Sequence, residues 1–295
     1  MQSARFHLIR AYLDPTHSLR DTIVPMGLSI KTLIGDLMKT IRALILIGGL
    51  VILLLAFGFV FRVTLVLRLW PWEDGRYSYL FIGSILAAVG AAAVWIGWTG
   101  ELAALPAGSL NVFVIALTTS LYFFRLIAQG RSELLITAIA SLLMAITSGV
   151  AFLWSHALSL TDPRPTPGLV KISFGIFIAA LFLAGGALVL HLPIFPWDLN
   201  PDSSVVFGCI FLGDAFYFLY GLFRPRWGNA CGQLLSFLAY DLVLILPFIQ
   251  LFSTIKPGRL LNLVVYVAVL VYSGGLAIYY LFIDPKTRFG TSSRV

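Results

Sequence analysis

Eight long apolar segments, separated by short polar connections, limit what this chain of 295 residues can fold into. They cover residues 43–66, 77–98, 110–128, 134–155, 170–191, 204–223, 232–252 and 260–283. A helix needs about 20 mainly apolar residues to cross a bilayer, whereas a barrel strand needs only about 10 that alternate. Only 11% of the residues are charged, against about 25% in a typical soluble domain. The sequence therefore predicts an all-α, polytopic integral membrane protein with about eight transmembrane helices.

A proline-rich linker, residues 156–169, divides these segments into two groups of four. Landmarks recur between the groups at one offset of 125 residues: Trp72 and Trp197, Gly83 and Gly208, Phe123 and Phe248, and the related stretches TSGVAF (147–152) and YSGGLA (272–277). Because each group has four helices, both groups enter the membrane from the same side. The pattern predicts two parallel four-helix repeats, residues 43–155 and 170–283.

The two ends of the chain carry most of its positive charge. Residues 1–42 and the basic tail 284–295 together supply +5 of the net charge of +7. Basic residues favour the cytoplasmic side of a membrane and are attracted to anionic headgroups. We therefore expect both termini in the cytoplasm and the chain in the cytoplasmic (inner) membrane. No basic-aromatic module accompanies the charge, so nucleic acid is not an expected partner.

The segment 1–42 also has an amphipathic pattern. Within 28–41, one helical face carries Ile30, Leu33, Ile34 and Leu37, and the charged residues lie on other faces. This pattern predicts a helix lying on the membrane surface, with a second, shorter one over residues 5–13. Docking on a partner protein and plain contact with lipid explain the apolar face equally well.

Two carboxylates interrupt the apolar segments near their midpoints, Asp214 and Asp241. An ionised Asp at the centre of a membrane helix costs roughly 2.5–3.5 kcal/mol, so we expect both to face the protein interior. No basic residue lies at a similar depth, and Tyr217 and Tyr240 are available as hydrogen-bond donors. We expect one shared polar pocket, with at least one of the two acids holding a proton. The pocket is interpreted either as a proton- or cation-responsive site or as a clamp between helices.

Two other sets of residues have a physical interpretation. Gly83, Gly90 and Gly97 recur at a spacing of seven, which lets helix backbones approach closely in lipid and predicts helix packing. Arg224 and Arg226 flank a short loop that could contact anionic lipid, although ordinary placement of basic residues on the cytoplasmic side explains them as well.

Cofactor and metal motifs are absent from the sequence. There is no zinc spacing, P-loop, dinucleotide fingerprint or nucleophile elbow. His156 and His191, at the ends of two segments, are weak candidates for haem or pigment ligands on one side of the membrane, and interfacial side chains are the simpler explanation. Bound lipid is the only ligand class that the composition suggests.

Three functions remain open on this sequence. The missing catalytic motifs, the glycine-lined second helix and the long N-terminal arm favour a non-catalytic subunit or assembly partner of a larger membrane protein complex. The repeat and the buried acids instead favour a proton- or cation-coupled transporter of small solutes. A membrane enzyme acting on lipid or quinone rests only on the aromatic residues and the loop of Arg224 and Arg226.

Overall fold

A computed structural model describes the backbone of residues 20–289, and side chains in that range except those of 20–31 and 34. The predicted short helix over 5–13 and the end of the basic tail lie outside the described residues. Clustering of contacts divides the chain into two compact units, Met1–Leu44 and Ile45–Val295. The fold described below is that of the second unit, together with the first helix by itself.

Within residues 20–289, eight helices are long and apolar enough to cross a membrane, as the sequence predicts. The long helices are α2 (Arg20–Val60), α4 (Arg76–Thr99), α5 (Leu105–Ala128), α6 (Leu135–His156), α7 (Gly168–Val189), α8 (Pro201–Phe223), α9 (Trp227–Leu251) and α10 (Leu260–Ile278). A single short helix, α3 (Thr64–Leu67), follows α2, and a turn of π-helix, Tyr279–Ile283, extends α10. No strand occurs within residues 20–289.

The first helix differs from the predicted segment at both of its ends. It begins at Arg20, so residues 28–41 and the first apolar segment form one continuous helix without a break at 42. It ends at Val60, six residues before the predicted end at 66. Arg62 has a left-handed φ of 57°, and the N–H of Val63 bonds to the carbonyl of Gly58 at 2.8 Å. This Schellman arrangement ends a helix, and it normally uses Gly rather than Arg, so the end of α2 could not be predicted from the residue types.

Glycines bring α2 and α4 into close contact. Gly83, Gly90 and Gly97, the three predicted for helix packing, all lie on this crossing. A Cβ atom added at Gly97 would lie 2.7 Å from the backbone nitrogen of Leu46, and one at Gly90 would lie 2.8 Å from the side chain of Leu53. Helices in lipid associate through such close packing, because burial of apolar surface gives no advantage there.

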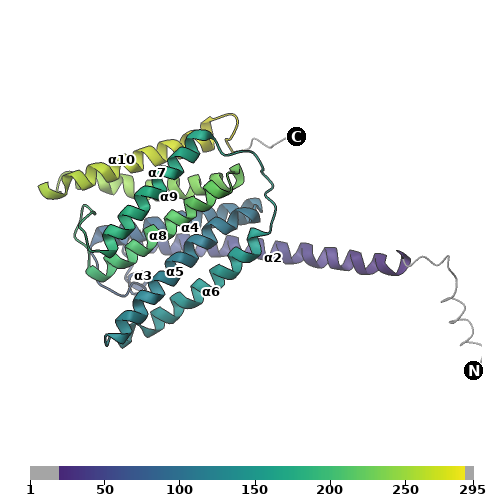
Figure 1. The fold of residues 1–295 in the computed structure, drawn as a ribbon, viewed down its shortest axis with the longest axis horizontal. Helices are drawn as coiled ribbons and strands as arrows, with labels where there is room; N and C mark the ends of the chain where they lie inside the picture. The colour runs from purple at the N-terminus through teal and green to yellow at the C-terminus, as the bar shows by residue number, and fades with distance from the viewer. Residues whose placement is uncertain (1–19, 290–295) are drawn as a thin grey trace, which may run out of the picture. The chain divides into compact units, whose positions relative to one another are not determined.

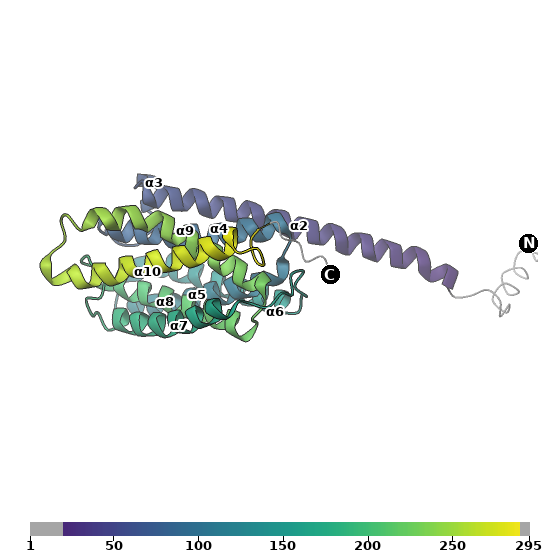
Figure 2. The same cartoon turned by 90° about the horizontal axis from the view of Figure 1, so that it is seen from above.

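The remaining helices contact one another both within each group of four and between the two groups. Helices α5 and α6 lie side by side, as do α7 and α8 (Figure 1), and Figure 2 shows α10 beside α9. The two groups meet where α4 packs on α9 and α5 packs on α8. We call these two contacts the seam. It joins helices from before the proline-rich linker to helices after it.

One end of the bundle is closed by the two Pro-Trp loops, 61–75 and 190–200, and we call it the Pro-Trp end. Trp72 packs on Phe123 of α5 with ring centroids 5.8 Å apart, and Trp197 packs on Phe248 of α9 at 5.6 Å. Both tryptophans are buried, and the indole N–H of Trp197 donates to Ser78 at the start of α4. Aromatic packing therefore anchors each loop to the third long helix of its own group.

The opposite end, which we call the linker end, carries the proline-rich linker and the loop 224–226. Glu101 is only 4% exposed there, and it accepts hydrogen bonds from the backbone N–H groups of Thr161 (3.1 Å) and Asp162 (3.3 Å). The first residue of α9 holds the linker from its other side, where the N–H of Trp227 donates to the carbonyl of Arg164. The linker is thus fixed to the bundle at several points.

Substitution of Gly97 tests the close crossing of α2 and α4. Gly97→Ala places a methyl group against the backbone of Leu46, and overpacking of this kind costs about 1–3 kcal/mol. Gly275→Ala is the matched control, because a Cβ at Gly275 of α10 meets nothing within 4 Å. We expect a lower melting temperature in detergent for Gly97→Ala and an equal or higher one for Gly275→Ala. Equal melting temperatures for both variants would contradict the crossing.

Candidate functional site

Asp214 lies in α8 and bonds across the seam. Its Oδ1 accepts a hydrogen bond from the side-chain amide of Asn111 on α5, with 2.9 Å between the two atoms. The backbone makes this approach feasible, since the neighbouring Gly213 has no side chain and a Cβ there would lie 2.7 Å from Asn111 Oδ1. A partly buried carboxyl group therefore joins one helix of each group.

Asp241 lies in α9 and is 4% exposed. Its Oδ1 accepts from the hydroxyl of Ser273 on α10 at 3.1 Å. Its Oδ2 is buried without a hydrogen-bond partner among the described residues, next to Gly274, where a Cβ would lie 3.4 Å away. An unpaired buried carboxylate oxygen is costly, so this oxygen marks a place where a proton or another cation would be stabilised.

The hydrogen bonds of Asp214 and Asp241 lead to different helices, and not to each other, within the polar pocket that we expected them to share. The expectation assumed that α8 and α9, which follow one another in the sequence, pack together. Instead α8 packs mainly on α7 and α5, and α9 packs mainly on α4 and α10. The two acids therefore face different neighbours, and each has its own clamp.

Two tyrosines nevertheless connect the surroundings of the two acids. The hydroxyl groups of Tyr240 on α9 and Tyr266 on α10 are hydrogen-bonded to each other. Both hydroxyls lie within electrostatic range of Asp214 and of Asp241. Tyr217, the other tyrosine named from the sequence, is hydrogen-bonded to Ser236 of α9 at 3.1 Å instead. Mid-membrane polar groups thus gather around the seam and the α9–α10 contact.

The seam has matching contacts at its two halves. Asn111 on α5 reaches Gly213 and Asp214 on α8. Ser236, which is 125 residues after Asn111, donates to the carbonyl of Ala88 on α4 at 3.1 Å. Ala88 is in turn 125 residues before Gly213. Positions related by this offset therefore touch in both contacts of the seam. Asp214 has no acidic counterpart, because the residue 125 positions before it is Val89.

Carboxylates neutralise basic groups at the Pro-Trp end. Asp202 accepts from Arg131 at 2.5 Å and from the Tyr122 hydroxyl at 2.6 Å. Asp198 accepts from Lys256 at 2.8 Å and from Arg259 at 3.0 Å. The hydrogen bond from Lys256 and the charge of both bases hold the pKa of Asp198 below its usual range.

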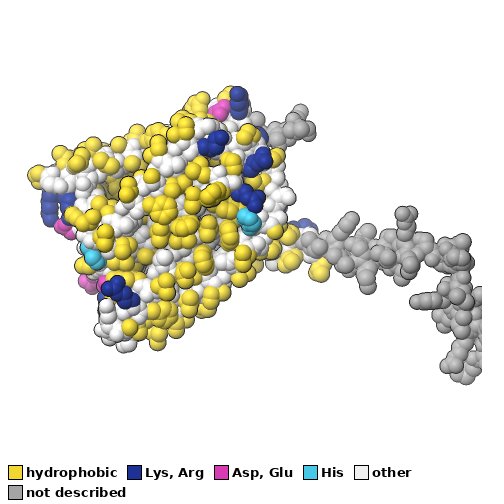
Figure 3. All heavy atoms as spheres, viewed as in Figure 1, with side chains coloured by type: hydrophobic (Ala, Val, Ile, Leu, Met, Phe, Trp, Pro, Cys, Tyr) yellow, Lys and Arg dark blue, Asp and Glu magenta, His cyan; other side chains and the backbone are white. Residues whose placement is uncertain are grey.

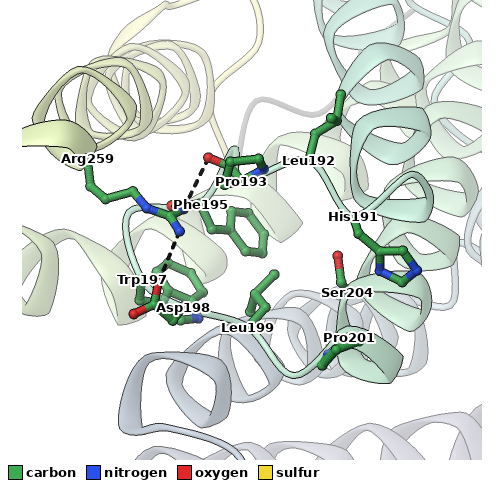
Figure 4. A pocket seen from close by; sticks show the side chains of 10 residues that line it. All are labelled: His191, Leu192, Pro193, Phe195, Trp197, Asp198, Leu199, Pro201, Ser204 and Arg259. Atoms are coloured by element: carbon green, nitrogen blue, oxygen red, sulfur yellow. Dashed lines mark hydrogen bonds and ion pairs between the residues drawn. The ribbon is translucent and has the colours of Figure 1, made fainter.

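A small pocket of about 200 Å³ lies at this same end (Figure 4). Arg259 spans its rim, where it donates to the carbonyl oxygens of Pro193 and Phe195. Ligand pockets for drug-sized molecules usually measure about 300–1,000 Å³. The pocket includes neither Asp214 nor Asp241 in its lining, so it is separate from the mid-membrane acids.

The two histidines lie at opposite ends of the bundle. His156 ends α6 at the linker end, and His191 follows α7 at the Pro-Trp end. Helix α7 has 22 residues, which corresponds to about 33 Å at 1.5 Å per residue. The expectation of paired ligands on one side of the membrane is therefore wrong. Within the described residues, no group of three His, Cys, Asp or Glu side chains is placed to hold a metal ion.

His156 instead takes part in a hydrogen-bonded chain at the linker end. Its Nδ1 lies 3.2 Å from the Tyr220 hydroxyl, and its Nε2 lies 3.0 Å from a guanidinium nitrogen of Arg224. Arg226 donates to the carbonyl of Pro163 in the linker at 3.0 Å. The two arginines named from the sequence are thus positioned by neutral groups.

Sequence reasoning missed the partners of the two acids, Asn111 and Ser273, and also missed Tyr266. Each is a polar side chain within a mainly apolar helix. Their presence was the available signal, since polar side chains inside membrane helices commonly bond to a neighbouring helix. The sequence did not reveal which helix would be the neighbour.

Substitution of Asp214 tests its bond across the seam. Asp214→Asn keeps an oxygen that accepts from Asn111, so we expect an unchanged melting temperature in detergent. Asp214→Leu leaves the buried Asn111 amide without its partner and should destabilise the protein by about 1–3 kcal/mol.

The double variant Asn111→Leu/Asp214→Leu provides the control for this test. It removes both partners together, so its loss of stability should be smaller than the sum of the two single losses, with a coupling of about 0.5–3 kcal/mol. Losses that simply add would show that the two side chains act independently.

Comparisons with protein-family models, curated proteins and solved structures find no match to this chain. The bundle thus holds two separately clamped acids near mid-membrane, ion pairs at the Pro-Trp end, and two arginines with neutral partners, Arg224 and Arg226, at the linker end.

Proposed function

We propose that the chain is a non-catalytic integral subunit, or assembly partner, of a larger membrane protein complex. The observation that carries the proposal is the length of α2. Its apolar span begins at Gly35, yet the helix already begins at Arg20. A span needs only about 20 residues, so the helix over 20–34 is extra to what crossing requires. A preformed helix of this kind suits docking on a neighbouring subunit.

The exposed side chains of α2 support the same proposal. Leu33, Leu37 and Leu44, all in the first unit, recur at spacings of four and seven on one helical face, and they are 70%, 55% and 64% exposed. An apolar strip at heptad spacing is the pattern by which one helix packs along another. We propose that a helix of a partner subunit occupies this strip.

The clamped acids also favour a structural role. Asp214 and Asp241 each bond to a side chain on another helix, which is the arrangement that holds a bundle together. Hydrogen bonds between membrane helices are worth about 0.6 kcal/mol on average. The acids are thereby explained without a transported solute.

The proposal includes an internal repeat of two four-helix units in the same orientation. Its support is the set of contacts related by the offset of 125 residues, which includes the two Trp–Phe pairs and the two halves of the seam. The α4–α9 contact becomes the α8–α5 contact under this offset, as a two-fold axis along the membrane normal requires. We further propose that the protein lies in the cytoplasmic (inner) membrane with both termini in the cytoplasm. Labelling of tags at the two termini in sealed vesicles would test this orientation.

Extraction from native membranes tests the subunit proposal. We expect the full chain to migrate on a native gel in a complex well above its own mass of 32.4 kDa. The pair Leu33→Gln/Leu37→Gln should shift it to a smaller species, because it places polar groups on the exposed apolar face of α2. Deletion of residues 1–31 should do the same, because it removes most of the helix that precedes the span. The matched control is Asp36→Ala/Lys39→Ala, which removes an exposed ion pair on the same turns and should leave the complex intact. Migration of the unaltered chain alone in mild detergent would contradict the proposal.

Proton-coupled transport is the second candidate, and Asp241 is the observation that favours it. Its Oδ2 is buried and unpaired, as expected for a carboxyl group that takes up and releases a proton. The nearby pair of tyrosine hydroxyls offers a polar connection towards Asp214.

Proton flux into proteoliposomes loaded with a pH-sensitive dye distinguishes the two candidates. If transport is the function, Asp241→Asn should abolish the flux driven by a membrane potential while leaving the melting temperature unchanged. Asp198→Asn, at the ion-paired Pro-Trp end, is the control and should retain the flux. No flux with the unaltered chain would exclude proton transport and leave the structural role.

A further inference from the structure

The linker end holds two guanidinium groups at the level where membrane helices end. Arg224 and Arg226 lie in the short loop between the candidate spans Pro201–Phe223 and Trp227–Leu251. His156, beside Arg224, is the last residue of the span of α6. Headgroup phosphates of a bilayer lie at this same depth.

Neither guanidinium has an acidic partner among the described residues. Arg224 contacts the ring nitrogen Nε2 of His156, and Arg226 donates to the carbonyl of Pro163. A ring nitrogen that accepts from Arg224 carries no proton, so His156 is neutral in this arrangement and donates from Nδ1 to Tyr220. Each guanidinium has five N–H donors, and most of those on Arg224 and Arg226 therefore remain available.

Several other basic groups in the bundle are paired with acids, whereas Arg224 and Arg226 are not. Arg131 and Lys256 at the Pro-Trp end are paired with Asp202 and Asp198. At the linker end, Arg164 is paired with Asp162 at 2.5 Å, and this pairing raises the pKa of Arg164. The linker thus neutralises its own arginine and leaves the charge of Arg224 and Arg226 uncompensated.

Apolar side chains border the two arginines on the membrane side. Phe223, next to Arg224, is 75% exposed, and Leu153, one turn before His156, is 73% exposed. Figure 3 shows Lys and Arg side chains gathered with a His at one end of a broad hydrophobic surface. Two arginines in one short loop, next to exposed apolar groups, match a ligand with a phosphate at one end and a hydrocarbon chain at the other.

We propose that Arg224 and Arg226 bind the phosphate of an anionic phospholipid whose acyl chain lies against Phe223 and Leu153. The planar guanidinium fork donates two parallel hydrogen bonds to phosphate oxygens, which a lysine ammonium does not. His156 is a positioning residue, since it holds Arg224 through Nε2. The site is independent of the proposed docking of α2, because it uses the ends of α6 and α8.

Titration of the purified full chain with short-chain phosphatidylglycerol, followed by native mass spectrometry, tests the site. We expect one tightly retained lipid and no comparable retention of phosphatidylcholine with the same chains. Arg224→Gln/Arg226→Gln should weaken phosphatidylglycerol binding by about tenfold or more, given the contribution of each basic residue near an anionic headgroup. Arg224→Lys/Arg226→Lys keeps the charge but loses the fork, so it should give an intermediate loss and serves if the Gln pair does not fold.

The matched control removes two positive charges from the same end at other places, Lys171→Gln/Lys286→Gln. It should bind phosphatidylglycerol as the unaltered chain does. Equal weakening by both pairs would show general attraction of anions and overturn the site. Inorganic phosphate is the second probe. Retention of inorganic phosphate equal to that of phosphatidylglycerol would show a site for free anions and overturn the lipid assignment.

Discussion

Lipid offers no hydrogen-bond partner, and this constraint explains which helices of the protein are joined. Every polar side chain inside the bundle has to find its partner on another helix or on a backbone carbonyl. Asp214 does so on α5 and Asp241 does so on α10. Ser236 reaches a carbonyl of α4, and Gln233 donates to the carbonyl of Tyr217 on α8 at 2.5 Å. The contacts of Asp214 and Ser236 cross the seam, so they join segments that lie far apart in the chain.

Small residues make these polar contacts feasible. Gly213 lets Asn111 approach α8, and Gly221 lets Gln233 approach, since a Cβ at Gly221 would lie 2.3 Å from the Gln233 amide oxygen. On the α2–α4 crossing, the same close approach joins apolar surfaces only. Glycine and polar residues therefore work together at the seam, whereas glycine alone suffices where no polar group is buried. The seam, where Asp214 bonds to Asn111, differs in this way from the α2–α4 crossing, which is apolar.

The sequence predicted the eight spans well because each segment had to match the thickness of a membrane. The predicted end of the first span was wrong, because Arg62 adopts the left-handed conformation that a glycine usually provides after a helix. Asp214 and Asp241 could be singled out, since an acid in an apolar segment stands out by composition. Their partners could not be predicted, because the order of helices in space differs from their order in the chain. Glu101 was missed for the same reason, since its partners are sixty residues away in the linker.

Contacts across the seam, rather than chain connectivity, hold the two groups of helices together. Co-expression of residues 1–158 and 159–295 as separate chains tests this, with Glu101→Ala included so that the linker contact does not contribute. We expect the two fragments to purify as one complex in mild detergent and Asn111→Leu to weaken their association. Fragments that insert into the membrane but purify separately would show that the seam does not hold the two groups together.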